Sequence, residues 1–235
     1  MRLYKVSALF KLGMEDLTKN MSVFIYVLLP LVMGLLYSNL DGISPEYNYS
    51  FSVLMNLAVI PVTLMGTIIA EEKEKNTLRT LMLNDVKALE ILSAKALICL
   101  IFMLLDNILL FFIVGLPMNL FVLYQIPAVF TAIALLFFGA FVGLMAKNQM
   151  SAGLLSLPFM VVFLAPLFVQ MMGNDLAKKI SSAIATDGLM KIYLAIAGND
   201  ITFSSIGLPI IVIVAWLVFS VVLFQIAYKK VKVDN

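Results

Sequence analysis

The residues best suited to chemistry are concentrated in one segment, residues 70–95, which reads AEEKEKNTLRTLMLNDVKALEILSAK. This segment carries five acidic and five basic side chains, whereas the sequence on both sides of it is almost uncharged. Clustered carboxylates act as metal ligands or as general acids and bases, usually together with histidine or cysteine. We therefore ask first whether the segment is catalytic or makes an interaction.

Enzymatic chemistry is restricted by the absence of one residue type. The chain has no histidine and one cysteine, Cys99, which excludes an H-E-x-x-H metal site and any Ser-His or Cys-His nucleophile. A single cysteine also excludes an intrachain disulfide. The pair Glu71-Glu72 is similar to the paired glutamates of intramembrane CAAX-type proteases, but this chain has Asn76 in place of their arginine and lacks their histidines. We expect no catalytic site and no bound metal.

The sequence also lacks a site for the usual energy source. No G-x-x-x-x-G-K-[ST] motif is present, so the chain cannot bind ATP in the manner of a P-loop protein. Any energy must come from a gradient or from another subunit. The net charge of +2 comes without a compact basic stripe, so we expect no nucleic-acid partner.

Composition identifies the protein class. Apolar residues make up 63% of the chain and charged residues 13%, against roughly 45–50% and about 25% in soluble domains. Six apolar runs are long enough to cross a membrane, which takes about 20 residues: 22–38, 51–70, 96–116, 126–146, 152–172 and 206–228. The first run is too long for a cleaved signal and no A-x-A site follows it, so we expect it to remain as a span. The predicted fold is an all-α polytopic membrane protein, with residues 1–235 as one transmembrane domain.

The distribution of lysine and arginine predicts the orientation. Thirteen of these residues lie before the first span, in the segment after the second span, or after the fourth and sixth spans. The other side has only Lys178, Lys179 and Lys191, all in one loop. Because cytoplasmic loops carry the excess of positive charge, both termini and the charged segment are expected in the cytoplasm of a multi-pass protein of the cell membrane, which we expect to be bacterial.

The charged segment itself reads as two helices joined by a turn. Strong helix formers run from Glu71 to Leu83, and Glu71 precedes Lys75 by four residues, the favourable order for an ion pair. Asn84-Asp85 predicts a turn and a helix start. Apolar residues recur at three- and four-residue steps, so the segment is either a solvated loop whose apolar stripe packs on its own bundle or an elbow that binds a partner.

The same residues carry a family resemblance. The pattern of Glu71-Glu72-Lys73-Glu74, Asn76-Thr77-Leu78, Leu81, a turn, and Glu90-Ile91-Leu92 before Lys95 resembles the loop between the second and third helices in permeases of type-2 ATP-binding-cassette (ABC-2) exporters. In that family the loop forms a coupling helix that rests on a separate ATPase subunit. The resemblance assigns the ATPase contact to Glu71, Glu72, Glu74, Thr77, Leu78, Arg79, Leu81, Met82 and Asp85.

This resemblance implies a transporter with several partners. They are separate ABC ATPase subunits, which bind ATP and magnesium, a second permease copy in a homodimer or heterodimer, and membrane lipid. The chain would form the translocation pathway and move a hydrophobic or amphipathic substrate out of the cell, such as a drug, a lipid-like compound or a membrane-active peptide.

Two flanking segments have amphipathic patterns. Residues 1–21 combine spaced apolar side chains with Arg2, Lys5 and Lys11, which predicts an interfacial helix or simply the positive flank of the first span. The external loop, 173–205, predicts two short helices separated at Asp187-Gly188. They would act either as a gate for substrate release or as a lid without substrate contact.

One acidic side chain falls inside a predicted span. Asp106 lies in the third span, where an ionised carboxylate is costly and normally faces protein or water. It is either a polar point in a pathway or a structural carboxyl, protonated or bonded to Asn107 or Asn56. The alternative function is therefore a gradient-driven secondary transporter that uses Asp106 as its ion site, and a third possibility is a non-transporting scaffold.

Overall fold

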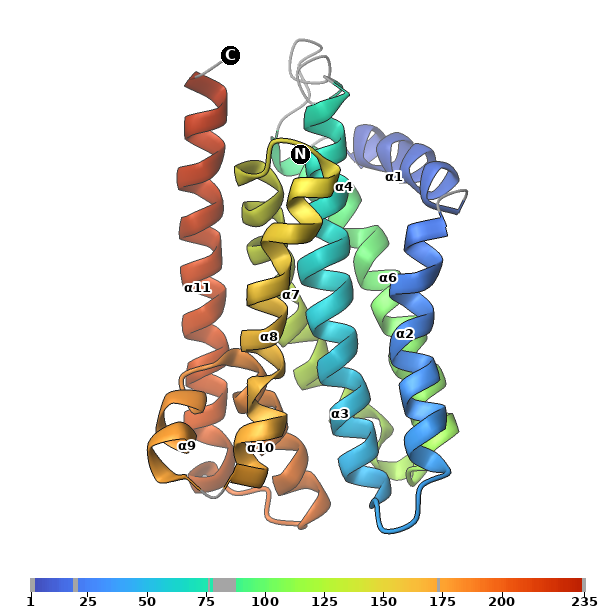
Figure 1. Cartoon of the computed structure of the whole chain (residues 1–235), viewed down its shortest axis with the longest axis vertical. Coiled ribbons are helices and arrows are strands. Elements are labelled where there is room, and N and C mark those ends of the chain that lie inside the picture. The colour runs from blue at the N-terminus through green and yellow to red at the C-terminus, as the bar shows by residue number, and fades with distance from the viewer. Residues whose placement is uncertain (1–2, 19–20, 76, 78–87, 173, 234–235) are drawn as a thin grey trace.

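The computed structural model of the chain describes residues 3–18, 21–75, 77, 88–172 and 174–233. Within these ranges every regular element is a helix (Figure 1). The elements are α1 (Leu3–Thr18), α2 (Met21–Ser38), α3 (Pro45–Leu57), the π-helix η1 (Ala58–Leu64), α4 (Met65–Glu74), α6 (Ala88–Val114), the 3₁₀ turn η2 (Met118–Leu120), α7 (Phe121–Met145), α8 (Gln149–Met172), α9 (Asp175–Ser181), α10 (Ala185–Ala197) and α11 (Phe203–Val233).

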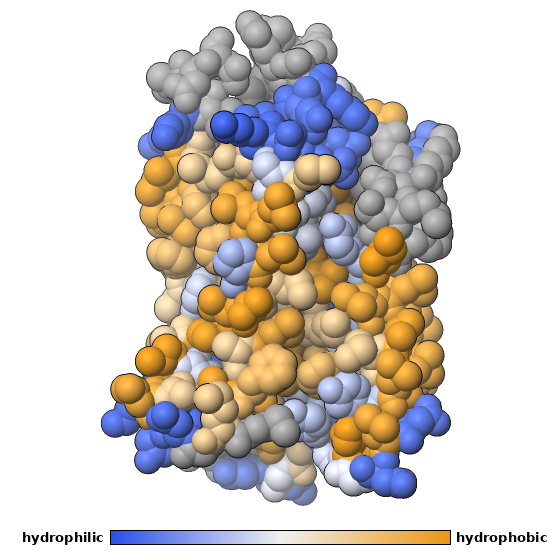
Figure 2. All heavy atoms as spheres, viewed as in Figure 1, coloured by the Kyte–Doolittle hydropathy of each residue, from blue (hydrophilic) through white to orange (hydrophobic). Residues whose placement is uncertain are grey.

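The predicted fold class agrees with the structure in its coarse form. Five helical segments of the described chain are long and apolar enough to cross a membrane: Pro45–Glu74, Glu90–Val114, Met118–Met145, Gln149–Val169 and Phe203–Lys230. A further apolar helix, Ile25–Ser38, is shorter, and α9 with α10 forms a pair bent by 103° that raises the number to six if it counts as one span. An apolar band surrounds the middle of the face shown in Figure 2, with hydrophilic residues at both ends. This architecture fits a helical polytopic membrane protein.

The long helices run roughly parallel, so the molecule has two distinct ends (Figure 1). At one, which we name the α1 end, α1 lies across the bundle and packs against α6, close to the end of α4. The C-terminal end of α11 lies at the same end of the molecule, on its opposite side. α9, α10 and the α2–α3 loop occupy the other, the α10 end. The helix α7 is central, because it packs against α11, α10, α4 and η1.

The helix expected at 51–70 is longer than predicted and changes its winding. It starts at Pro45, because the Ser44 hydroxyl accepts a hydrogen bond from the backbone N–H of Tyr47 at 3.2 Å and proline is favoured in the first turn. It ends at Glu74. Between them lies the π-helix, which contains Pro61. Proline has no N–H to donate, so it disrupts regular α-helical bonding, and the wider turn absorbs the disruption.

Small residues allow this helix to lie close to α7. A Cβ atom added to Gly139 would lie 2.8 Å from the carbonyl oxygen of Val62, and one added to Gly66 would lie 3.2 Å from the carbonyl oxygen of Gly139. Gly139 and Gly143 are four residues apart on one face of α7, the small-xxx-small spacing typical of close helix pairs in membranes. The backbone of α7 therefore rests directly on η1 and α4.

The two short helices of the external loop are present, but the predicted break between them is wrong. The break lies at residues 182–184, and Asp187 and Gly188 belong to the first turn of α10. Asp187 is favourable there, because it accepts a hydrogen bond from the Ser181 hydroxyl at 2.8 Å and pairs with Lys191 at 2.7 Å. Gly188 serves packing, since a Cβ atom at that position would lie 2.9 Å from the Pro209 carbonyl oxygen.

A buried tyrosine cluster holds α10 in the bundle. The rings of Tyr49, Tyr124 and Tyr193 have centroids 4.8–5.7 Å apart and come from α3, α7 and α10. The Tyr193 hydroxyl donates to the backbone carbonyl of Tyr124 at 3.0 Å, and Gln125 donates to the Tyr49 hydroxyl at 2.9 Å. α10 is thus a built-in part of the core, whereas α9 leaves Leu176 exposed.

Candidate functional site

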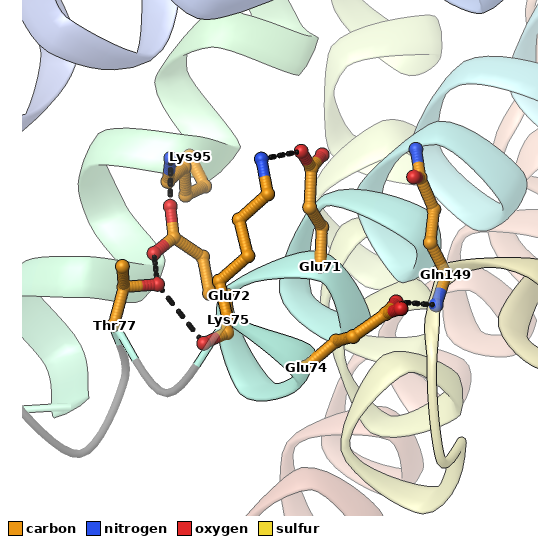
Figure 3. A network of polar contacts seen from close by, with 7 residues as sticks. All are labelled: Glu71, Glu72, Glu74, Lys75, Thr77, Lys95 and Gln149. Carbon is orange, nitrogen blue, oxygen red and sulfur yellow. Dashed lines mark hydrogen bonds and ion pairs between the residues drawn. The ribbon is translucent and has the colours of Figure 1, made fainter.

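The described part of the charged segment forms a polar network at the α1 end, shown in Figure 3. Lys95 of α6 pairs with Glu72 of α4 at 2.5 Å, with only 7% and 17% of their side chains exposed. The Glu72 carboxylate and its backbone carbonyl also accept from the Thr77 hydroxyl. We name this network, with the contacts in the next paragraph, the polar junction: Glu71, Glu72, Lys73, Glu74, Lys75, Thr77, Lys95 and Gln149.

The end of α4 also binds the connection between α7 and α8. The Lys73 ammonium group donates to the backbone carbonyls of Leu144 and Ala146, each at 2.9 Å, where α7 ends. The neighbouring Glu74 carboxylate accepts from the backbone N–H of Gln149 at 2.9 Å, where α8 begins. A cation at a helix C-terminus and an anion at an N-terminus both match the helix dipoles. One turn of α4 therefore holds α6, α7 and α8 together.

The predicted interaction residues divide into two groups. The structure brings Glu71, Glu72, Glu74 and Thr77 together in the polar junction, and the expected pair of Glu71 with Lys75 is confirmed at 2.5 Å. Each of these four makes a bond within the chain. The remaining predicted residues, Leu78, Arg79, Leu81, Met82 and Asp85, lie outside the described residues, as does the predicted turn at 84–85.

A groove of about 560 Å³ lies between α2 and α8 and is floored by η1 and α4. Its lining residues are Ile25, Tyr26, Leu29, Val59, Thr63, Thr67, Gln149, Met150, Gly153, Leu154, Leu157 and Met160. We name it the α2–α8 groove. It combines long apolar side chains with hydroxyl and amide groups, and the π-helix supplies part of its floor. Such a mixed lining suits an amphipathic molecule better than lipid chains alone.

The groove and the polar junction share one residue. Gln149 lines the groove, and its backbone N–H is bonded to Glu74 in the junction. Thr67, on the floor of the groove, lies two helical turns before Glu74 on the same helix. The end of α4 is therefore connected to the groove twice, through Gln149 in its wall and through Thr67 on its floor.

The buried acid of the third span is separate from this network. Asp106 is 1% exposed, and its Oδ2 atom has no hydrogen-bond partner among the described residues. Asn56 instead donates to the Asn107 side-chain oxygen at 2.7 Å and to the Met103 carbonyl at 3.0 Å. The two amides thus join α3 to α6, and this geometry gives Asp106 no bond through its Oδ2 atom to either of them.

Sequence reasoning missed three of the eight residues of the junction. Lys73, Lys95 and Gln149 were not predicted as its members, because their partners lie 71, 23 and 75 positions away along the chain. One chemical signal was present in the sequence: five consecutive charged residues, Glu71 to Lys75, stand at the end of an apolar helix, at the level where neighbouring spans also end and leave backbone groups unpaired. The groove depends on tertiary packing and had no signal beyond the threonines.

No protein-family model matches this chain, and no curated protein matches it. The functional conclusion is therefore built on the residues and contacts described above.

Proposed function

We propose that the chain is the transmembrane subunit of an ABC-2 type exporter that moves an amphipathic substrate out of the cell. Two copies, or one copy and a related chain, form the pathway, and separate ATPase subunits bind ATP and magnesium. The observation that carries the proposal is the direct connection of the polar junction to the α2–α8 groove through Glu74 and Gln149. An exporter whose energy comes from a separate ATPase subunit needs a connection between the surface that contacts the ATPase and the pathway of the substrate.

The distribution of charge supports a cytoplasmic α1 end. Lys73, Lys75, Lys95 and Lys147 all belong to the junction or to the nearby α7–α8 connection, and α11 ends with Lys229 and Lys230 near the same end. The α10 end holds Lys178, Lys179 and Lys191. By the positive-inside rule the α1 end faces the cytoplasm. The partner ATPase then binds at this end of the molecule.

The mechanism follows from the contacts of α4. Binding of ATP closes the ATPase subunits and moves the segment that joins α4 to α6. The glutamates and Thr77 hold the base of this segment within the chain, so its contact with the ATPase comes chiefly from the apolar residues Leu78 and Leu81. The movement passes through Lys73 and Glu74 to α7 and α8, where it changes the width of the groove and releases the substrate to the outside.

The first test is co-purification from the native membrane in detergent. We expect wild-type chain to recover a P-loop ATPase, and Leu78→Glu and Leu81→Glu to lose it. The matched control is Leu176→Glu, which makes the same change at an exposed leucine of α9 at the other end of the molecule. Recovery of the chain without an ATPase, or equal recovery with all variants, would overturn the proposal.

A second candidate function depends on Asp106. A buried carboxylate with one unpaired oxygen is suited to binding a proton or another cation, as a gradient-driven transporter requires. Proteoliposomes that contain the chain alone, compared with proteoliposomes that also contain the co-purified ATPase, separate the two functions. Uptake driven by a proton gradient without ATP, and abolished by Asp106→Asn, would support the secondary transporter, whereas uptake that requires the ATPase would support the exporter.

A further inference from the structure

A second hollow lies between α2, α3 and α8, nearer the α10 end than the groove. It has a volume of about 420 Å³ and is lined by Tyr37, Gly42, Ile43, Ser44, Tyr47, Phe51, Leu167 and Phe168. Half of these eight residues are aromatic, and we name the hollow the aromatic pocket. The groove is lined by earlier turns of α2 and α8 and by later turns of the helix that begins with α3. The two sites therefore follow one seam of the molecule.

The aromatic side chains present rings from three different elements. Tyr37 of α2 and Phe51 of α3 have ring centroids 4.6 Å apart, with ring planes inclined by 33°. Tyr47 lies one turn before Phe51 on α3, and Phe168 contributes from α8 with 57% of its surface exposed. Ring faces attract cations through their quadrupole, and several rings around one hollow bind quaternary ammonium groups. A neutral apolar ligand gains nothing from this arrangement beyond burial.

The charges carried by the segments that line the pocket have a single sign, and the one lysine of α10, Lys191, is paired with Asp187 at 2.7 Å. The sequence from residue 20 to residue 70 contains two acidic residues, Asp41 and Glu46, and no lysine or arginine. Asp41 adjoins the lining residue Gly42, and Glu46 adjoins Tyr47. Helix α8 carries no charged residue. Lys178 and Lys179 lie on α9, which Figure 1 shows on the other side of α10 from the α2–α3 loop.

We propose that the aromatic pocket binds a lipophilic organic cation, a quaternary ammonium or phosphonium compound, as the substrate leaves the groove. This inference rests on the proposed function and adds its substrate class. The volume falls within the usual range for small-molecule sites, about 300–1,000 Å³. The rings bind the cationic centre and its apolar substituents, and Asp41 and Glu46 favour a positive ligand over a neutral or negative one.

The test measures binding to the full chain alone in nanodiscs, with radiolabelled tetraphenylphosphonium as the probe and empty discs as the blank. We expect saturable binding that Phe51→Leu weakens about tenfold and that Asp41→Asn weakens about threefold. The matched control is Phe130→Leu, which removes a ring from a separate apolar hollow between α7, α10 and α11. Neutral triphenylphosphine oxide should compete poorly.

Each other result would overturn the proposal. Saturable binding that Phe51→Leu and Asp41→Asn leave unchanged would show that the cation binds elsewhere. Equal competition by triphenylphosphine oxide would show that the site recognises the shape of the ligand and not its charge. Weaker binding in phosphatidylcholine discs than in discs of an uncharged glycolipid would identify the lipid headgroup as the occupant. Because no ATPase takes part, these results do not depend on whether the chain is driven by ATP.

Discussion

Replacing Lys95 with Met should destabilise the protein by about 3–5 kcal/mol, because it leaves the Glu72 carboxylate without its partner in a poorly solvated position. The two charges are 2.5 Å apart, which corresponds to about 7 kcal/mol of Coulomb attraction at an effective dielectric constant of about 20. Part of this attraction offsets the desolvation of both groups. The loss should fall to about 1 kcal/mol or less when Lys95→Met is made in a Glu72→Gln background, since no charge is then left unpaired.

The chain contains a matched control for this pair. Lys75 and Glu71 are also 2.5 Å apart, but 64% of the Lys75 side chain is exposed. Lys75→Met should therefore cost less than about 1 kcal/mol. The assay is equilibrium unfolding in mixed micelles, followed through the fluorescence of Trp216, the only tryptophan of the chain. Equal losses for Lys95→Met and Lys75→Met, or a loss at Lys95 that persists without Glu72, would refute the reasoning.

Three further results follow from the packing. Gly139→Val should cost more than about 3 kcal/mol in the same assay, because the new side chain meets the backbone of η1, whereas a Cβ atom at Gly153 would meet only the Thr67 side chain, at 4.0 Å, and Gly153→Val should be nearly neutral. Asn56→Leu and Asn107→Leu should each lower the unfolding free energy by about 1–3 kcal/mol, and the double variant should lose less than the sum; additive losses would contradict the bond between them. Lys73→Met should speed hydrogen exchange about tenfold at amides 144–149, and unchanged exchange there would show that the cap is dispensable.

The features of the fold that depend on residues close together in the sequence were predictable from it. The apolar runs predicted the long helices, since a helix satisfies its own backbone in a membrane. The pair of Glu71 with Lys75 was predictable because both residues lie on one helical face. Both predictions use neighbours within about one helical turn.

The remaining features depend on partners that the sequence does not identify. Glu72 could have paired with several lysines, and only the packing of α4 beside α6 selects Lys95. Asp187-Gly188 has the composition of a turn, yet the close approach of the Pro209 carbonyl makes that glycine a packing residue inside α10. A proline inside a helix is compatible with a kink or with a π-helix, and the π-helix around Pro61, against which α7 packs closely, is seen only in the structure.

The π-helix also sets the angular phase between the two halves of its helix. A π turn closes its hydrogen bonds one residue later than an α turn, and each residue of an α-helix advances the side chain by about 100° around the axis. If residues 58–64 were instead wound as a regular α-helix, the same number of residues would rotate Met65–Glu74 by about 100° relative to α3. Lys73 and Glu74 would then turn away from the ends of α7 and α8, although α3 would keep its own contacts. The wider turns of the π-helix thus absorb one extra residue and keep the charged end of the helix aligned with its partners.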